Sequence, residues 1–328
     1  MSGVRYAVGF DGGGTKTTGC LISSDGDYYA SLTGGATNYS ISLEKAIQQE
    51  LAEMTRSLCK RAGLSHLDAL GVCLSGLGQE AVRQRVRRLI EEKELAQAYH
   101  VDHDARAALY GAFAGGPGII LIAGTGSIAF AQDENGEVYR CGGWGYLLGD
   151  EGSGFDIARR GIAAALKALD GRGKPTSLQA AFEQKFAVSR IDEAVPLIYS
   201  EYSDRGKMAQ LATIVFEHSK AGDVVAGEII GNAAGAYAEL VAALFTRVAV
   251  DGVADVALIG NIFNSASQLL PIMQSYWKEH RLHISIVKPL FPAEVGAALL
   301  AFASAGIDFS QEAIVRLQHT IQEKAGRG

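Results

Sequence analysis

Cysteine is scarce in this chain, and the few cysteines present are far apart. The four of them, Cys20, Cys59, Cys73 and Cys141, are scattered through 328 residues and form no C-x-x-C pair. Closely spaced cysteines are what structural zinc sites and the disulfide frames of small secreted domains require. The sequence therefore favours a protein of the reducing cytoplasm without either feature.

The chain also lacks an excess of positive charge. Its formal net charge is −6, and its one basic cluster, Arg83 to Arg88, is followed by Glu91, Glu92 and Glu94. Adjacent blocks of opposite charge are typical of a solvated helix face rather than a nucleic-acid patch. We therefore expect no nucleic-acid partner.

Long apolar runs are missing as well. No uninterrupted run reaches the length of a membrane helix, and the start has a single Arg before a short strand, without a leader-type apolar core. We expect no membrane association. With 48% hydrophobic and 20% charged residues, 328 residues are enough for two cores of ordinary size, so two domains are predicted.

A glycine-rich turn near the start is the most informative stretch that is present. Asp11-Gly12-Gly13-Gly14-Thr15-Lys16 separates two strand-like runs, at 4–10 and 17–23, which predicts a hairpin. Consecutive glycines let backbone N–H groups bind a phosphate, and an acid at a strand end can hold Mg²⁺ through water. Walker and Rossmann loops are excluded because both open a helix. On this turn alone, an ordinary hairpin is an equally good interpretation.

Two polar residues of the first half are ambiguous by position. Asn38 follows a turn-rich loop and precedes a helical pattern at 42–62, where Asn commonly caps a helix. Asp104 lies between a short strand at 99–101 and a helix at 105–114. A carboxylate there either caps the helix or lies where open α/β sheets expose reactive groups.

The hairpin pattern recurs after Gly115-Gly116-Pro117-Gly118, where we place a domain boundary. A strand at 119–123, the turn Gly124-Thr125-Gly126-Ser127 and a strand at 128–132 follow. Two such hairpins facing each other across a cleft could hold one triphosphate. This duplication is more specific than either turn alone.

Two further glycine-containing segments lie in the second half. Residues 142–154 are dense in glycine around Trp144, which favours a backbone wrapped about a small ligand over a mobile loop with a buried Trp. Gly260-Asn261 ends a strand at 253–259 and either contacts an adenosine or makes a plain turn to the helix at 266–280. Most of the remainder is predicted helical, including 155–169, 177–186, 207–219, 223–250 and 311–324.

These motifs together resemble the N-acetylglucosamine kinases of the BadF/BadG/BcrA/BcrD ATPase family, within the actin, sugar kinase and heat-shock chaperone superfamily. The resemblance covers nearly the whole chain and is most specific in the first hairpin and from Asp104 to Ser153. It implies an α/β fold of two ribonuclease H-like, or actin-like ATPase, domains of βββαβα type facing across a nucleotide cleft. The expected domains are 1–116 and 117–305, with a helix in 306–328 packing back on the first.

The resemblance also implies roles for individual residues. Asp104 matches the catalytic base, and Asp11 the acid on the metal side. The positions that match the sugar site are Asn38, Asp104, Trp144, Gly145 and Asp150. The positions that match the nucleotide site are Gly13, Gly14, Thr15, Lys16, Thr125, Gly126, Gly260 and Asn261.

The implied reaction is transfer of the γ-phosphoryl group of ATP, with Mg²⁺, to the 6-hydroxyl of N-acetylglucosamine in a cytoplasmic homodimer. Asp102 is a rival base, but the family pattern places the acid directly before Ala. Glucosamine or N-acetylmuramic acid is an alternative acceptor. A family activase with an iron–sulfur cluster fits the scattered cysteines poorly, and a chaperone would need a large peptide-binding domain.

Overall fold

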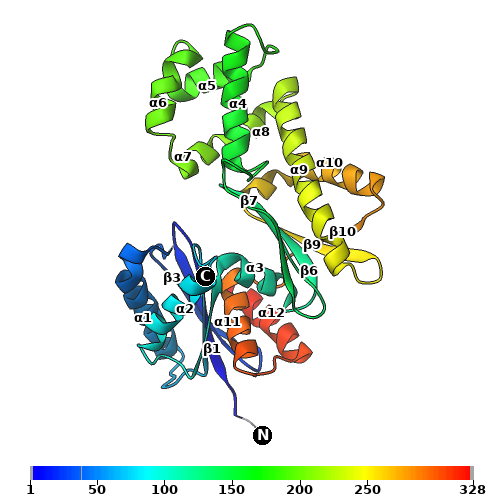
Figure 1. Cartoon of the computed structure of the whole chain (residues 1–328). Coiled ribbons are helices and arrows are strands. Elements are labelled where there is room, and N and C mark those ends of the chain that lie inside the picture. The colour runs from blue at the N-terminus through cyan, green and yellow to red at the C-terminus, as the bar shows by residue number, and fades with distance from the viewer. Residues whose placement is uncertain (1–2, 38, 326–328) are drawn as a thin grey trace. The chain divides into compact units, whose positions relative to one another are not determined.

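The computed structural model describes residues 3–37 and 39–325, and it divides the chain into two compact units (Figure 1). The first unit comprises Met1–Pro117 and Lys288–Gly328, and the second comprises Gly118–Val287. The sequence pattern predicts residues 288–305 in the second domain. They belong to the first because helix α11 (Ala293–Ser304) packs on that unit's sheet and on α3 (Asp104–Phe113).

The first unit is built on a five-stranded sheet of order β3-β2-β1-β4-β5. Its strands are β1 (Tyr6–Gly12), β2 (Thr17–Ser23), β3 (Tyr28–Gly34), β4 (Ala69–Leu74) and β5 (Ala98–His103). The first three form an antiparallel meander that contains the hairpin predicted at 4–10 and 17–23, and β4 and β5 run parallel to β1. Asp11 is in register with Cys73, and Cys73 with Asp102, so β1, β4 and β5 end at the same edge of the sheet.

Helices cover the first sheet on both faces. Helix α1 (Glu44–Arg61) buries its apolar positions Ile47, Leu51, Met54 and Leu58 in the same cluster as α2 (Glu80–Glu91). Helix α12 (Gln311–Ala325) lies along β3, where Arg316 pairs with Asp27 at 2.7 Å.

Glycines allow α11 to approach the sheet closely. An added Cβ at Gly9 of β1 would lie 2.1 Å from the Glu294 carbonyl oxygen, and one at Gly71 of β4 would lie 2.0 Å from that of Ala297. At a third close approach, a Cβ added to Gly296 of α11 would lie 2.0 Å from the Ala107 oxygen of α3. Because no side chain intervenes, the start of α11 is held against the strand that ends in Asp11.

The second unit repeats this plan around a sheet of order β10-β9-β6-β7-β8. Its strands are β6 (Gly118–Ala123), β7 (Ser127–Gln132), β8 (Val138–Gly142), β9 (Val253–Ile259) and β10 (His283–Val287). Again three antiparallel strands continue into two parallel ones. The predicted fold class, two ribonuclease H-like units, is confirmed.

Seven helices are described in the second unit. They are α4 (Gly154–Leu169), α5 (Leu178–Phe186), α6 (Val195–Ser200), α7 (Arg205–Gln210), α8 (Ala212–Lys220), α9 (Val224–Val248) and α10 (Ala266–Glu279). The single helix expected over 207–219 is divided in two, because a tight turn closes at Leu211, whose N–H bonds to the Met208 oxygen at 3.0 Å.

Helix α9 is the longest apolar element. Among residues 3–37 and 39–325 it is the one helix whose length and composition would allow it to cross a membrane. Its inward side chains, which include Ile229, Tyr237 and Val241, belong to the main core cluster of the second unit. Its outward positions include Glu228 and Glu239, as a core helix with one solvated face requires.

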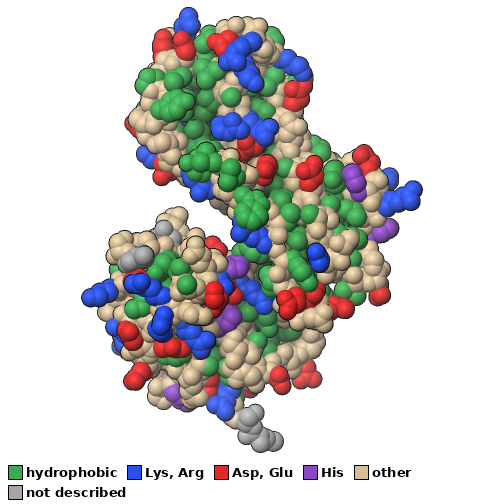
Figure 2. Space-filling view, viewed as in Figure 1, with side chains coloured by type: hydrophobic (Ala, Val, Ile, Leu, Met, Phe, Trp, Pro, Cys, Tyr) green, Lys and Arg blue, Asp and Glu red, His purple; other side chains and the backbone are tan. Residues whose placement is uncertain are grey.

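The basic cluster on α2 is paired with acidic side chains. Arg83 contacts Glu80 at 2.6 Å, and Arg87 contacts Glu91 at 2.7 Å within the helix. Arg85 reaches Glu44 of α1 at 2.6 Å. On the face shown in Figure 2, acidic and basic side chains are intermingled over each unit, as expected for solvated helix faces.

Candidate active site

The first glycine turn is a tight, exposed connection between β1 and β2. The Gly13 N–H donates to the Lys16 carbonyl at 3.0 Å, and Gly14 to Lys16 are exposed. Nothing in the described part of the chain lies within 4 Å of a Cβ built on Gly13 or Gly14, so open space faces the backbone there. A phosphate could approach these amides without displacing a side chain.

Thr37 anchors the loop that precedes the first helix to this turn. Its N–H donates to the Gly13 oxygen at 3.2 Å, and its buried hydroxyl lies 2.6 Å from that of Thr17. On the other side, the Tyr39 N–H donates to the Ser75 oxygen at 2.9 Å. The sugar position expected at Asn38 lies outside the described residues.

Asp11 ends β1 in a strongly anionic environment. The pKa of its carboxyl is raised to about 7, first by burial and then by the charges of Asp104 and Glu294, while Lys16 acts in the opposite sense. These charges interact because β1 and β5 end at one sheet edge with only β4 between them. A cation bound here would relieve the repulsion.

The donor set at Asp11 fits Mg²⁺ better than a metal held by protein alone. Within residues 3–37 and 39–325, no group of three or more His, Cys, Asp or Glu side chains is placed to hold a metal. Mg²⁺ instead keeps several waters and binds one or two carboxylates together with substrate phosphates. Asp11, next to the exposed glycine turn that a phosphate could approach, meets that description.

Glu294 is a candidate site residue that the sequence pattern does not single out. It lies in the first turn of α11, held against Gly9, and burial is the main cause of its raised pKa. In the sequence, Glu294 is recognisable only as an acidic residue at the start of a helical segment rich in small residues. The packing of α11 on β1 brings its charge near Asp11 although 283 positions separate them (294 − 11).

Asp104 is the first residue of α3, but it does not cap that helix. The cap is His103, whose Nδ1 accepts the Arg106 N–H at 3.2 Å. The Asp104 carboxylate accepts the N–H of its neighbour Ala105 at 2.9 Å. The capping interpretation is therefore wrong, and this carboxylate stands at the carboxyl end of β5, where reactive groups are expected.

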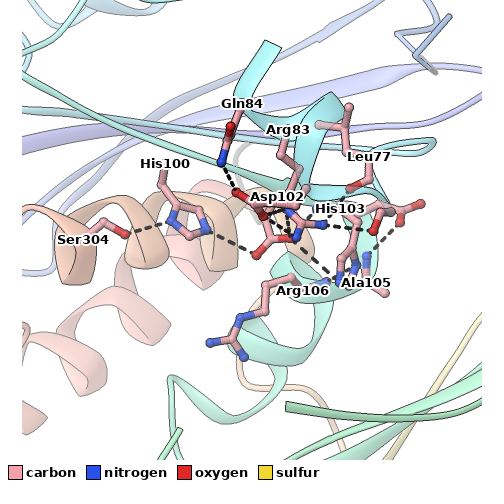
Figure 3. Close-up of polar contacts among 12 residues, drawn as sticks. Leu77, Arg83, Gln84, His100, Asp102, His103, Ala105, Arg106 and Ser304 are labelled. Atoms are coloured by element: carbon pink, nitrogen blue, oxygen red, sulfur yellow. Dashed lines mark hydrogen bonds and ion pairs between the residues drawn. The ribbon is translucent and has the colours of Figure 1, made fainter. Parts of the chain in front are cut away.

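Asp102 occupies a different environment, the centre of a charged network behind the strand end (Figure 3). Its carboxylate accepts the His103 N–H at 2.8 Å and lies 3.8 Å from Arg83, His100 and His103. His100 in turn lies 2.8 Å from the Ser304 hydroxyl of α11. The network ties β5 to α2 and α11, so Asp102 is placed to hold the strand end rather than to react.

The second glycine turn, between β6 and β7, is tied to the following loop. Gly124 N–H donates to the Gly126 oxygen at 2.9 Å, and the Gly124 oxygen accepts the Gly154 N–H at 2.8 Å. Thr125 is exposed at its tip. Gly260, with φ +111°, comes so close to the end of β6 that an added Cβ would lie 2.1 Å from the Ala123 oxygen. Gly260 and Asn261 are therefore next to the strand that leads into this turn.

The glycine-dense loop at 142–154 adopts left-handed backbone at several glycines, including Gly142, Gly143 and Gly145. Trp144 is 66% exposed and stacks under the Arg140 guanidinium, 4.3 Å from the ring centre. The alternative of a loop held by a buried Trp is therefore wrong. Arg140 covers one face of the indole, and the large exposed fraction leaves ring surface accessible, as a sugar-stacking residue requires.

Asp150 is a buried acidic residue of this loop. Its side chain is only 6% exposed, and its φ of +59° is unusual for a residue with a Cβ. One oxygen accepts the Gly145 N–H at 3.3 Å, and the other lies 2.8 Å from where a Cβ on Gly126 would be. The structure thus brings Asp150, Gly145 and the second glycine turn together, while Asp11, Asp104 and the first turn meet in the other unit.

Known proteins match this chain along most of its length. It is 31% identical over 235 residues to the N-acetylmuramic acid/N-acetylglucosamine kinase of Clostridium acetobutylicum, covering 70% of this chain and 76% of that protein. It is 29% identical to the N-acetyl-D-glucosamine kinase of Dictyostelium discoideum, covering 90% and 98%.

A solved structure and a family model agree with these matches. The crystal structure of a proposed N-acetylglucosamine kinase from Chromobacterium violaceum has a TM-score of 0.70 and 28% identity, covering 90% of this chain and 99% of that one. The model of the BadF/BadG/BcrA/BcrD ATPase family matches residues 8–301, a span that includes every candidate site residue. The chain has two ribonuclease H-like units, and a glycine turn closes the first hairpin of each. It belongs to the BadF/BadG/BcrA/BcrD ATPase family.

Proposed function

We propose that this protein is a cytoplasmic kinase that transfers the γ-phosphoryl group of ATP to the 6-hydroxyl of N-acetylglucosamine. The observation that carries the proposal is the position of Asp104. Its carboxylate is not used as a helix cap and stands at the same sheet edge as Asp11 and the exposed turn of Gly13 and Gly14. A base and a phosphate-binding turn at one edge suit phosphoryl transfer to an alcohol.

In the proposed reaction, Asp104 accepts the proton of the sugar 6-hydroxyl. At the same time the hydroxyl oxygen bonds to the γ-phosphorus of ATP, and the bond from that phosphorus to the leaving ADP oxygen breaks. The glycine turns, with Thr15, Lys16, Thr125 and Gly126, donate hydrogen bonds to phosphate oxygens. Asp11, with Glu294 beside it, would hold hydrated Mg²⁺, which when bound neutralises phosphate charge. Gly260 and Asn261 would contact the adenosine.

The acceptor is assigned to Asn38 and to residues of the glycine-dense loop at 142–154, which we call the sugar loop. Asp150 keeps acceptor capacity for sugar hydroxyls because its two hydrogen bonds are long, at 3.3 Å each. Gly145 supplies backbone beside it, and the exposed Trp144 offers an apolar face to the sugar ring.

A coupled assay of ADP formation across N-acetylglucosamine, glucosamine, N-acetylmuramic acid and glucose tests the proposal. We expect the highest kcat/KM with N-acetylglucosamine. The relative from C. acetobutylicum is named for two acceptors, so substantial activity with N-acetylmuramic acid would widen the assignment. Activity with none of these sugars would overturn it.

An iron–sulfur activase is less favoured, since Cys20 and Cys73 are fully buried in the first unit.

Replacement of Asp11 by Asn should make the enzyme demand more magnesium. The substitution removes the carboxylate that attracts hydrated Mg²⁺ but keeps the side-chain volume, so we expect lower turnover and a magnesium half-saturation raised about tenfold. Titration of turnover with MgCl₂ at saturating ATP measures this, with thermal unfolding as the folding control. A magnesium titration that matches the wild type would remove Asp11 from the metal site.

We also propose that the protein is a homodimer, as the family resemblance suggests. Light scattering at micromolar concentration should give about twice the 34.6 kDa mass of the chain. A single-chain mass would overturn this part of the proposal without affecting the chemistry.

A further inference from the structure

Asp150 has one cationic partner in the described part of the chain, and it comes from outside the sugar loop. Arg205 Nη2 lies 3.3 Å from Asp150 Oδ2, and the other carboxylate oxygen accepts the Gly145 N–H. The side chain of Asp150 is 6% exposed, against 44% for Arg205. A carboxylate this deeply buried needs polar partners, and Arg205 and the Gly145 N–H supply them.

The position of Arg205 is fixed independently of the loop. It opens α7, whose cap is Asp204, with the Asp204 carboxylate accepting the Lys207 N–H at 2.8 Å. Helix α7 packs on α4, the helix that follows the loop. The guanidinium also stacks on the Tyr146 ring, 5.2 Å from its centre. Arg205 therefore contacts the loop at two points, one of them the acid assigned to the acceptor.

We propose that Arg205 is a positioning residue for the sugar acceptor, which holds the Asp150 carboxylate in the orientation that accepts hydrogen bonds from the acceptor hydroxyls. This role rests on the proposed function, in which Asp150 binds those hydroxyls. The planar guanidinium suits it because the same group can stack on an aromatic ring and donate to a carboxylate. Its donation to Asp150 is single and long, so the carboxylate can still accept from a ligand.

The competing explanation is that Arg205 only ties the loop to α7. The two roles differ in which ligand is affected and in how Arg205 and Asp150 combine. A positioning residue acts on the sugar through Asp150, so its effect should be confined to sugar affinity and should disappear when Asp150 is already replaced. A loop tie would weaken sugar and nucleotide binding together and would add to the effect of an Asp150 variant.

The test compares the variants Arg205→Ala, Arg205→Lys and Asp150→Asn and the double variant Arg205→Ala/Asp150→Asn. Affinities for N-acetylglucosamine and for a non-hydrolysable ATP analogue are measured by calorimetry. Arg172→Ala is the matched control, because Arg172 is also an exposed arginine paired with an aspartate, Asp170 at 2.7 Å. Thermal unfolding of each variant monitors the fold.

We expect Arg205→Ala to weaken sugar binding about 10- to 100-fold at pH 7, with the ATP analogue affected less than about threefold. Arg205→Lys should recover part of the affinity, and Arg205→Ala should add little in the Asp150→Asn background. Arg172→Ala should match the wild type.

Three outcomes would overturn the role. Unchanged sugar affinity in Arg205→Ala is one, and a loss of the same size in the Asp150→Asn background is another. The third is an equal loss for sugar and nucleotide together with early unfolding, which indicates a structural tie. If the wild type binds and phosphorylates no sugar of the panel, the proposed function fails first, and this role of Arg205 falls with it.

Discussion

Replacement of Asp104 by Asn should nearly abolish phosphoryl transfer while leaving both substrates bound. A general base acts in the transition state, so its removal is expected to lower kcat by about 10²–10⁴ and to change ground-state affinities only a few-fold. Asn keeps the oxygen that accepts the Ala105 N–H at 2.9 Å, so α3 should still begin at the same residue. Single-turnover phosphorylation and calorimetry with ATP and N-acetylglucosamine separate the two effects.

Asp102→Asn is the matched control, two residues earlier on the same strand end. An Asn there keeps the oxygen that accepts the His103 N–H at 2.8 Å, and it loses only the charge facing Arg83 and His100 at 3.8 Å. We expect kcat within about tenfold of the wild type. If Asp102→Asn were inactive and Asp104→Asn active, the two roles would be exchanged, and two active variants would contradict the proposed mechanism.

Gly9→Ala should destabilise the protein strongly, although it adds only one methyl group. The new Cβ would lie 2.1 Å from the Glu294 carbonyl oxygen and 2.3 Å from the Ala298 nitrogen, both of which are backbone atoms of α11 that no rotamer change can move. Relief requires displacing α11 from β1, so we expect the free energy of unfolding to fall by at least about 3 kcal/mol. Urea denaturation followed by circular dichroism measures this change.

Gly78→Ala controls for the loss of a glycine, since no atom of the described residues lies within 4 Å of a Cβ at that position. Its unfolding midpoint should stay near that of the wild type or rise slightly. The folded fraction of Gly9→Ala should also lose activity, because displacement of α11 from β1 moves Glu294 away from Asp11. A Gly9→Ala protein as stable as the wild type would show that α11 is not seated directly on β1.

Features that depend on local pattern can be predicted from the amino-acid sequence alone. Each glycine turn follows a strand-like run, so both hairpins and their strands are predictable at 11–16 and 124–127. The carboxyl end of a strand is also a local feature, and it points to Asp102 and Asp104, between which the family resemblance chooses Asp104. The edge strands β8 and β10 are not predicted, because short half-exposed strands carry little apolar alternation.

Tertiary packing, in contrast, sets which distant residues join these turns. Helix α11 returns to the first unit from the far end of the chain because Gly9 and Gly71 admit its backbone, and it brings Glu294 to Asp11. Arg205 reaches Asp150 across 55 positions because α7 packs on α4. Periodicity records which face of an element is buried, but not which other element buries it, and that partner is set by the packing of the whole unit.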